Sequence, residues 1–278
     1  MREGMLAGRV AVVTGAGSGM GRATARLMAE EGAAVGVADI ELSRAETVAT
    51  EINQAGGRAI PISVDTRDVE SNRAMVSSVV DAFGALHVAH LHTGGGGDST
   101  VLDADVDGFD KGIALTLRGT FLGLTATAPA IVDAAGGSIV CTSSVAAILG
   151  QRGLCAYSAG KAGVLGLVRS AAAELAPHNV RVNAICPNVI HTGIFSWKYP
   201  RPEDLDAEVG RFHTLNRVGR PEEVANLVVF LASDKASFMT GGSYLIDGGS
   251  TSTQSWEFHE QLESMFSGSG RGMAQVKR

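Results

Sequence analysis

Two side chains that could perform acid–base chemistry, Tyr157 and Lys161, lie four residues apart. On an α-helix this spacing puts both on one face. A free phenol has a pKa of about 10, which is too high for a base at neutral pH. A neighbouring ammonium group favours the phenolate and lowers this pKa. The pair therefore predicts a tyrosine that takes a proton from an alcohol or returns one to a ketone.

A glycine-rich segment, Thr-Gly-Ala-Gly-Ser-Gly-Met-Gly at 14–21, joins the first expected strand to the first expected helix. Glycines permit a tight turn, a close approach to a pyrophosphate and close packing of the helix on the strand. Phosphates would lie at the helix N-terminus, where unpaired N–H groups and the helix dipole favour negative charge. The segment predicts a dinucleotide site that includes Gly15, Gly17, Ser18, Gly19, Met20 and Gly21.

Asp39 stands at the end of the second expected strand. A carboxylate at this place can accept both hydroxyls of an adenine ribose and would repel a 2′-phosphate. Neither Ser18 nor Ile40 supplies the positive charge that a 2′-phosphate requires. The expected cofactor is therefore NAD, not NADP. Its positive nicotinamide is expected to help the Lys161 ammonium favour the Tyr157 phenolate.

The elements that must position these residues alternate between short apolar strands and helices. The expected strands are 10–14, 34–39, 59–64, 86–92, 138–142, 181–186 and 243–247. The expected helices are 21–31, 44–54, 69–83, 106–116, 119–134, 156–175 and 221–232. This alternation predicts an α/β protein with a doubly wound parallel sheet and helices on both faces, forming one domain over residues 1–250.

Two segments fall outside the alternation. Residues 188–219 are long for a loop and carry Phe195, Trp197, Tyr199 and Phe212, so a substrate lid is expected there. Residues 251–278 form a C-terminal tail, expected as a helix and then a flexible end. Its apolar face would contain Phe258, Leu262, Met265 and Phe266, and could pack on a neighbouring subunit or cover the active-site mouth.

Composition limits the partners. The 278 residues carry a net charge of −6, with 45% hydrophobic and 19% charged residues. These values indicate a globular protein and argue against binding to nucleic acid or to an anionic membrane. Cys141, Cys155 and Cys186 are widely spaced, which suggests reduced thiols. With no expected signal peptide or membrane span, a cytoplasmic location is expected.

The spacing Gly15-xxx-Gly19-x-Gly21, together with Tyr157-Ser-Ala-Gly-Lys161, resembles the short-chain dehydrogenase/reductase family in its shorter, single-domain branch. The similarity extends from Ala7 to Ser250. Further matching pieces are Asp65, Ser143-Ser144, and the segments 187–192, 219–224 and 246–249. The resemblance implies a Rossmann fold with seven strands and a homotetramer or homodimer.

The resemblance also implies roles for individual residues. Ser144 would orient the substrate oxygen, and Lys161 would also bind the nicotinamide ribose. Ile190 and Thr192 would meet the nicotinamide carboxamide after a turn shaped by Pro187, although Asn188 replaces the usual glycine there. Further cofactor contacts are implied for Ile40, Asp65, Thr66, His92, Thr93 and Gly94.

The chain departs from the family pattern in two places. The usual Asn-Asn-Ala-Gly at the end of the fourth strand is Leu-His-Thr-Gly at 91–94. His90 and His92 lie two residues apart, which raises a metal site, but no carboxylate or thiol ligands accompany them; we expect hydrogen bonding and no metal. Thr116 replaces the asparagine that anchors a water in the family's proton relay. Its shorter side chain predicts an altered but working relay, or exchange through other waters.

Together these features predict an NAD(H)-dependent oxidoreductase that interconverts a secondary alcohol and a ketone, with Tyr157 as general acid/base. The aromatic lid favours a small, moderately apolar or cyclic substrate. A catalytically silent dinucleotide-binding sensor or scaffold is the alternative from another class. Dehydration or epimerisation through a transient ketone is a third reading, although such relatives usually carry a larger substrate domain. The substrate itself and the physiological direction stay open.

Overall fold

The structure, a computed structural model, describes residues 4–95, 100–102, 105–196, 198–254, 258, 261 and 264. Its centre is one parallel sheet with the strand order β3-β2-β1-β4-β5-β6-β7. The strands are β1 Val10–Thr14, β2 Ala34–Asp39, β3 Arg58–Ser63, β4 Val88–Leu91, β5 Gly137–Thr142, β6 Val180–Pro187 and β7 Ser243–Ile246. The predicted seven-stranded, doubly wound sheet is confirmed.

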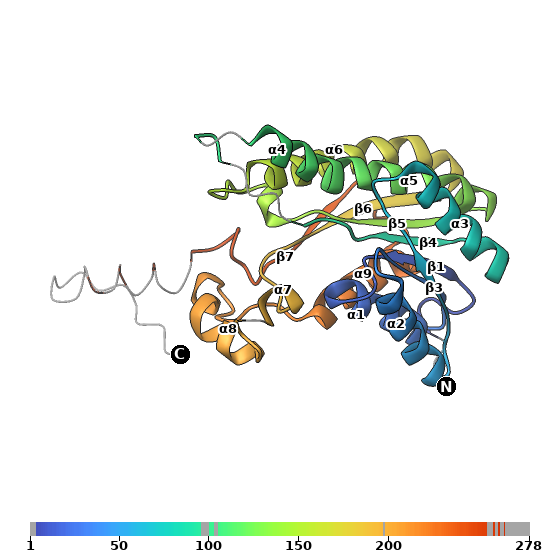
Figure 1. Cartoon of the computed structure of the whole chain (residues 1–278), viewed down its shortest axis with the longest axis horizontal. Coiled ribbons are helices and arrows are strands. Elements are labelled where there is room, and N and C mark those ends of the chain that lie inside the picture. The colour runs from blue at the N-terminus through green and yellow to red at the C-terminus, as the bar shows by residue number, and fades with distance from the viewer. Residues whose placement is uncertain are drawn as a thin grey trace.

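Helices cover both faces of this sheet (Figure 1). They are α1 Gly19–Glu30, α2 Leu42–Gln54, α3 Val69–Phe83, α4 Val106–Ile113, α5 Gly119–Asp133, α6 Cys155–Leu175, α7 Gly193–Ser196, α8 Pro202–Val209 and α9 Pro221–Ala232. Alternate residues of β1 serve different layers: Ala11 and Val13 join the core with α1, α2 and α9, whereas Val10 and Val12 join the core with α3, α5 and α6. Because β1 is buried on both faces, its residues before Thr14 are all apolar.

The strand order reverses at β1, which lies between β2 and β4. In open parallel sheets a crevice opens at such a reversal, at the carboxyl ends of the strands. The glycine-rich turn follows β1, Asp39 ends β2, and Ser144 follows β5. The topology thus brings the predicted site residues to one edge of the sheet.

One long helical stretch differs from its expected form. The helices expected at 106–116 and 119–134 are continuous, joined by a π-helical turn at Ala114–Arg118. By length and composition alone, the stretch Val106–Asp133 could cross a membrane. Less than half of its most apolar part, 44%, is buried, but α5 packs against α3 and α6. This packing fits a helix of the protein core.

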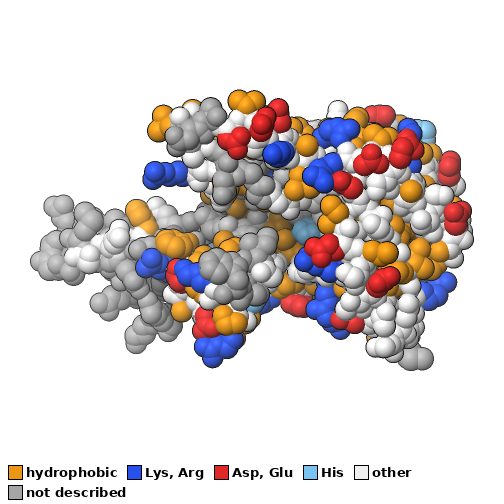
Figure 2. All heavy atoms as spheres, viewed as in Figure 1, with side chains coloured by type: hydrophobic (Ala, Val, Ile, Leu, Met, Phe, Trp, Pro, Cys, Tyr) orange, Lys and Arg blue, Asp and Glu red, His pale blue; other side chains and the backbone are white. Residues whose placement is uncertain are grey.

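The lid contains more regular structure than expected, because α7, α8 and a 3-10 turn at Gly210–Phe212 lie within residues 188–219. In Figure 2 a hollow separates the α4 end of the molecule from this lid, and acidic and basic side chains are interspersed over the visible face. Trp197 of the lid lies outside the described residues, as do Leu262, Met265 and Phe266 of the tail.

Candidate active site

The glycine-rich turn is held by Asp39. Its two carboxylate oxygens accept the main-chain N–H groups of Gly17 (2.9 Å) and Glu41 (3.0 Å). A Cβ atom on Gly17 would lie only 2.8 Å from the Asp39 carboxylate, and one on Gly21 would lie 2.1 Å from the carbonyl oxygen of Gly15. Side chains at these two glycines would therefore push the turn away from β2 and α1 away from β1.

The start of α1 offers donors for an anion. Ser18 precedes the helix in an extended conformation, and its side chain makes no capping hydrogen bond. A Cβ atom on Gly19 would lie 3.1 Å from the methyl group of Thr192, so the segment after β6 lies against this turn. The residues predicted to hold the diphosphate and the nicotinamide are thus adjacent. They fit a dinucleotide whose diphosphate rests on the first turn of α1.

Lys161 on α6 is 2% exposed and ends in a cradle of main-chain carbonyls. Its Nζ atom donates hydrogen bonds to the carbonyls of Thr142 (2.7 Å) and Thr93 (2.9 Å). A Cβ atom on Gly94 would lie 2.6 Å from this Nζ atom. Burial lowers the pKa of Lys161 to about 8. The ammonium group is therefore largely desolvated, and two carbonyl dipoles take the place of water.

Tyr157 lies beside Lys161 and shares a side-chain hydrogen bond with Ser144. The Lys161 Nζ atom is 5.7 Å from the centre of the Tyr157 ring. Ser144 is itself fixed because its hydroxyl accepts the N–H of Ala146 (3.1 Å) where a 3-10 turn follows β5. The structure therefore brings together Ser144, Tyr157 and Lys161.

The pKa of the Tyr157 phenol bears on the expected part of Lys161. In the protein without a bound dinucleotide this pKa is raised, because burial disfavours the phenolate more than the Ser144 hydrogen bond favours it. Lys161 by itself therefore does not produce the lowering expected from Lys161 together with the nicotinamide, which stays a prediction. A base at this position requires further positive charge nearby, such as that of an oxidised nicotinamide.

Thr116 lies in the π-helical turn and is fully buried. Its hydroxyl donates to the carbonyl of Gly112 (2.7 Å), and its own carbonyl accepts from Thr120 (2.7 Å). A Cβ atom on Gly160 would meet the Thr116 hydroxyl at 1.9 Å. Thr116 thus packs against α6 next to Lys161, with its hydrogen committed to its own helix.

The residues predicted for the adenosine side lie around the ends of β2 and β3. Ile40 is exposed directly after Asp39, and Thr66 is buried. Both oxygens of Asp65 bind the Arg67 guanidinium, at 2.9 and 2.8 Å, and this hydrogen bonding lowers the pKa of Asp65. Sequence reasoning missed Arg67. The cofactor contacts of Ile40, Asp65 and Thr66 stay predictions.

The two histidines at the end of β4 share one hydroxyl. Thr142 Oγ1 lies 2.9 Å from His90 Nε2 and 3.1 Å from His92 Nδ1. The main-chain N–H of His92 donates to the hydroxyl of Thr14 (2.9 Å), where the glycine-rich turn begins. Burial lowers the pKa of both imidazoles, that of His92 to about 4. Across the described residues, no group of three or more His, Cys, Asp or Glu side chains could hold a metal ion.

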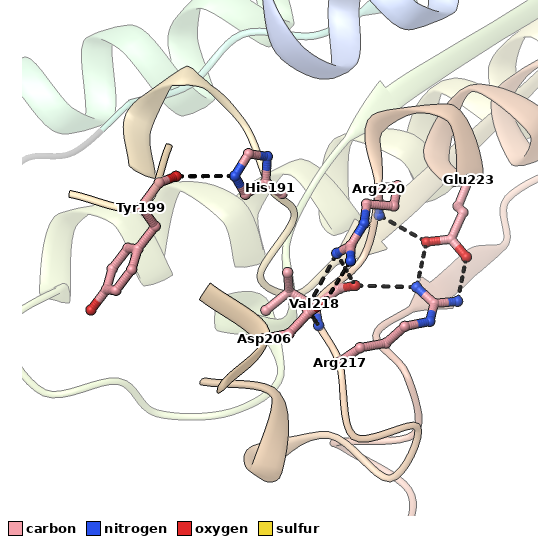
Figure 3. Close-up of polar contacts among 7 residues, drawn as sticks. All are labelled: His191, Tyr199, Asp206, Arg217, Val218, Arg220 and Glu223. Carbon is pink, nitrogen blue, oxygen red and sulfur yellow. Dashed lines mark hydrogen bonds and ion pairs between the residues drawn. The ribbon is translucent and has the colours of Figure 1, made fainter. Parts of the chain in front are cut away.

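The lid is fastened to α9 by ion pairs (Figure 3). Asp206 on α8 accepts from the Val218 N–H (2.8 Å) and pairs with Arg220, while Arg217 pairs with Glu223 (2.6 Å). The ring of His191 donates to the carbonyl of Tyr199 (3.2 Å) within the lid. The sequence marked 219–224 only as a family-like segment, without this anchoring role.

Pro187, Ile190 and Thr192 lead from the sheet into this lid. Pro187 is the last residue of β6, and Ile190 is buried and forms an isolated parallel bridge with Gly219. The position of Thr192 against Gly19 links this segment to the glycine-rich turn. The nicotinamide contacts of Pro187, Ile190 and Thr192 stay predictions.

Comparison with known proteins agrees with this arrangement. Residues 15–251 match the family described as enoyl-(acyl carrier protein) reductase. The chain is 40% identical over 245 residues to a cyclohexanol dehydrogenase from Acinetobacter sp. (strain SE19), covering 88% of this chain and 95% of that protein. It is 39% identical over 252 residues to a trans-4-hydroxycyclohexanecarboxylate dehydrogenase from Sinomonas cyclohexanicum, covering 88% and 94%.

A crystal structure of a short-chain type dehydrogenase/reductase from Mycobacterium marinum superposes with a TM-score of 0.83 at 35% identity, covering 89% of this chain and 97% of that one. The matches in sequence and in fold therefore cover nearly the same share of the chain. The chain belongs to the short-chain dehydrogenase/reductase family.

Proposed function

We propose that this protein is an NAD-dependent dehydrogenase that interconverts a secondary alcohol on an alicyclic ring and the corresponding ketone. The observation that carries this proposal is the hydrogen-bonded pair Ser144 and Tyr157 beside the buried Lys161. Relatives named as dehydrogenases of cyclohexanol and of a hydroxycyclohexanecarboxylate support an alicyclic substrate.

Each of these residues has a defined task in the proposed reaction. The Ser144 hydroxyl and the Tyr157 phenol both bind the substrate oxygen, and Tyr157 takes its proton during oxidation or returns it during reduction. The Lys161 ammonium stabilises the phenolate. When bound, NAD⁺ supplies the acceptor for the hydride that leaves the carbinol carbon.

The proposed preference for NAD rests on Asp39. Each carboxylate oxygen already accepts one main-chain N–H, but further lone pairs remain for ribose hydroxyls. A 2′-phosphate here would face this negative charge. The nearby Arg44 guanidinium is paired with Glu41 (2.9 Å), so its charge is already partly neutralised.

Spectrophotometry of the purified protein tests the proposal. With cyclohexanol and NAD⁺ we expect NADH formation, and with NADP⁺ a kcat/KM at least about tenfold lower. Tyr157→Phe should lower kcat by roughly a thousandfold or more while NADH affinity, measured by fluorescence, stays within about threefold. Tyr244→Phe on β7, outside the proposed site, is the matched control and should retain turnover.

Two results would contradict the proposal. Undiminished turnover in Tyr157→Phe would remove the phenol from the mechanism. Tight NADH binding by the wild-type protein, without turnover of any cyclic or open-chain ketone in a broad panel, would instead favour the sensor.

We further propose, from the family resemblance, a cytoplasmic homotetramer or homodimer built from one domain over residues 1–250. Light scattering after size exclusion measures the assembly, and fractionation of cells measures the location. Truncation after Ser250 should change the oligomer size or the substrate KM if the tail packs on a subunit or on the active-site mouth. An unaltered enzyme would remove that role.

A further inference from the structure

Thr142, the last residue of β5, connects Lys161 to two buried histidines. Its carbonyl accepts from the Lys161 ammonium at 2.7 Å, and its hydroxyl lies between His90 Nε2 (2.9 Å) and His92 Nδ1 (3.1 Å). Thr142 is 4% exposed and His90 is fully buried. Thr142 thus holds Lys161 through its main-chain carbonyl and both histidines through its side-chain hydroxyl.

The positions of the protons shared by His90, Thr142 and His92 can be assigned. Burial lowers the pKa of both imidazoles, so each ring is neutral at pH 7 and carries one N–H. His90 Nδ1 is buried and has no hydrogen-bond partner among the described residues. A proton on that nitrogen would be a buried, unbonded donor, which is costly. The proton therefore belongs on His90 Nε2, which donates to Thr142, whose own hydrogen then points to His92 Nδ1.

His92, the last member of this hydrogen-bonded series, is also bonded to the glycine-rich turn. The main-chain N–H of His92 donates to the Thr14 hydroxyl at 2.9 Å. A Cβ atom on Gly15 would lie 2.5 Å from the His92 carbonyl oxygen, so the two segments are in close contact. The next residue, Thr93, supplies the second carbonyl that holds Lys161. The carbonyls of Thr142 and Thr93, which hold Lys161, therefore both belong to residues within or next to the hydrogen-bonded series of His90, Thr142 and His92.

We propose that His90 and His92 are positioning residues that, through the hydroxyl of Thr142, fix the two carbonyls that orient the Lys161 ammonium. This inference rests on the proposed role of Lys161 beside Tyr157. Without the Thr142 hydroxyl, the carbonyls of Thr142 and Thr93 are less constrained and the ammonium is held less well. The phenolate of Tyr157 then loses part of its electrostatic support.

Several charged or titratable groups face the histidine pair and Lys161. His92 faces the ammonium of Lys161 from α6 and the carboxylate of Asp39 from β2, which shift its pKa in opposite directions. The two imidazole rings also face each other, with centroids 5.4 Å apart. Lys161 itself lies near the thiols of Cys141 on β5 and Cys186 on β6. Removing an uncharged hydroxyl leaves all of these groups in place.

Nitrogen-15 NMR of the protein without cofactor is the direct test. In the wild type, long-range ¹H–¹⁵N spectra should show His90 and His92 both with the proton on Nε2. In Thr142→Val, which keeps the shape of the side chain, the pKa of the Lys161 ammonium should fall by about half a unit or more. Thr142→Ser should restore it. Thr127→Val, which removes a buried hydroxyl bonded within α5, is the matched control and should leave Lys161 unchanged.

Kinetics provide the second readout. For alcohol oxidation by Thr142→Val, the acidic limb of the kcat profile should move to higher pH by about half a unit or more, with the KM for NAD⁺ within about twofold. A Lys161 titration that is the same in Thr142→Val as in the wild type, or a His90 proton on Nδ1, would overturn the inference. Because the NMR measurements need no turnover, failure of the proposed dehydrogenase activity would be recognised separately.

Discussion

The hydroxyl of Thr116 donates its hydrogen to the main-chain carbonyl of Gly112, 2.7 Å away in the same helix. The family resemblance had predicted an altered relay in which Thr116 binds a water. The hydroxyl can still accept a hydrogen bond, but its single hydrogen is committed. This geometry favours the alternative in which proton exchange passes through other waters.

Replacing Thr116 by valine should therefore have little effect on turnover. The change keeps the β-branched shape against Gly160 and removes one buried hydrogen bond. We expect kcat within about threefold and a loss of about 1 kcal/mol in the free energy of unfolding. Thr127→Val is the control for loss of a buried intrahelical hydroxyl. A tenfold or larger fall in kcat, confined to Thr116→Val, would restore Thr116 to the relay.

Asp39→Asn should weaken and broaden cofactor use. The amide presents an N–H₂ group where a carboxylate oxygen now accepts the Gly17 or Glu41 N–H, and it no longer repels a 2′-phosphate. We expect kcat/KM with NAD⁺ to fall roughly 10–100-fold, as for a lost hydrogen bond to a charged group, and the NAD⁺/NADP⁺ ratio to fall at least about tenfold.

Glu70→Gln on α3 is the control for Asp39, since it removes a carboxylate from an exposed ion pair, with Arg73, that contributes little. Its kcat/KM should change less than about twofold. If Asp39→Asn kept the NAD⁺/NADP⁺ ratio of the wild type, discrimination would have to reside elsewhere.

The lowered pKa of Lys161 predicts a pH dependence of stability. Above its folded pKa of about 8, the folded protein has lost a proton that the unfolded chain keeps until its ordinary pKa of about 10.5. The free energy of unfolding therefore gains a contribution that rises with pH, of roughly 1 kcal/mol between pH 8 and 9. Lys161→Met should lack this contribution.

Urea unfolding of the cofactor-free protein at several pH values between 7.5 and 9 measures this difference. Burial raises the pKa of Cys141 to about 12, which acts in the opposite direction above pH 9, but this group is common to both proteins. Parallel curves for the wild type and Lys161→Met would show that Lys161 titrates normally.

Breaking an ion pair of the lid should change the KM for the alcohol but not the KM for NAD⁺. Asp206 joins α8 to Val218 and Arg220, and the pair is largely shielded from water. In Asp206→Asn the lid is held less firmly, so we expect the KM for the alcohol to rise about three- to tenfold and the KM for NAD⁺ to stay within about twofold. Asp204→Asn breaks the more exposed pair with Arg201 and should be nearly silent. Equal effects of the two variants would refute the anchoring role.

The sequence was enough to predict at which edge of the sheet the site lies, because the candidate cofactor-binding and catalytic residues come at the ends of strands. Gly15, Asp39 and Ser144 each stand at a strand end, and the carboxyl ends of parallel strands meet at one edge. The pairing of Tyr157 with Lys161 followed from helical spacing alone. Boundaries moved by only a residue or two, as for α1, which begins at Gly19 and not at 21.

What could not be predicted depends on register and on solvation. That Thr142 lies between His90 and His92 depends on how β4 aligns with β5, which no local spacing reveals. The raised pKa of Tyr157 reflects burial, which the position of Lys161 in the sequence does not report. By contrast, α8 had a readable signal, since Pro202 followed by Glu203 and Asp204 is typical of a helix N-terminus.

The attachment of α8 to α9 has a consequence for how this scaffold can diversify. The ion pairs hold the lid at its base, through residues that neither form the sheet nor touch Lys161. If the lid binds the substrate as proposed, the side chains of residues 198–201 can therefore change, and with them the shape offered to that substrate, while Tyr157 and Lys161 stay where they are. New specificities could arise here by small steps without the fold being rebuilt each time.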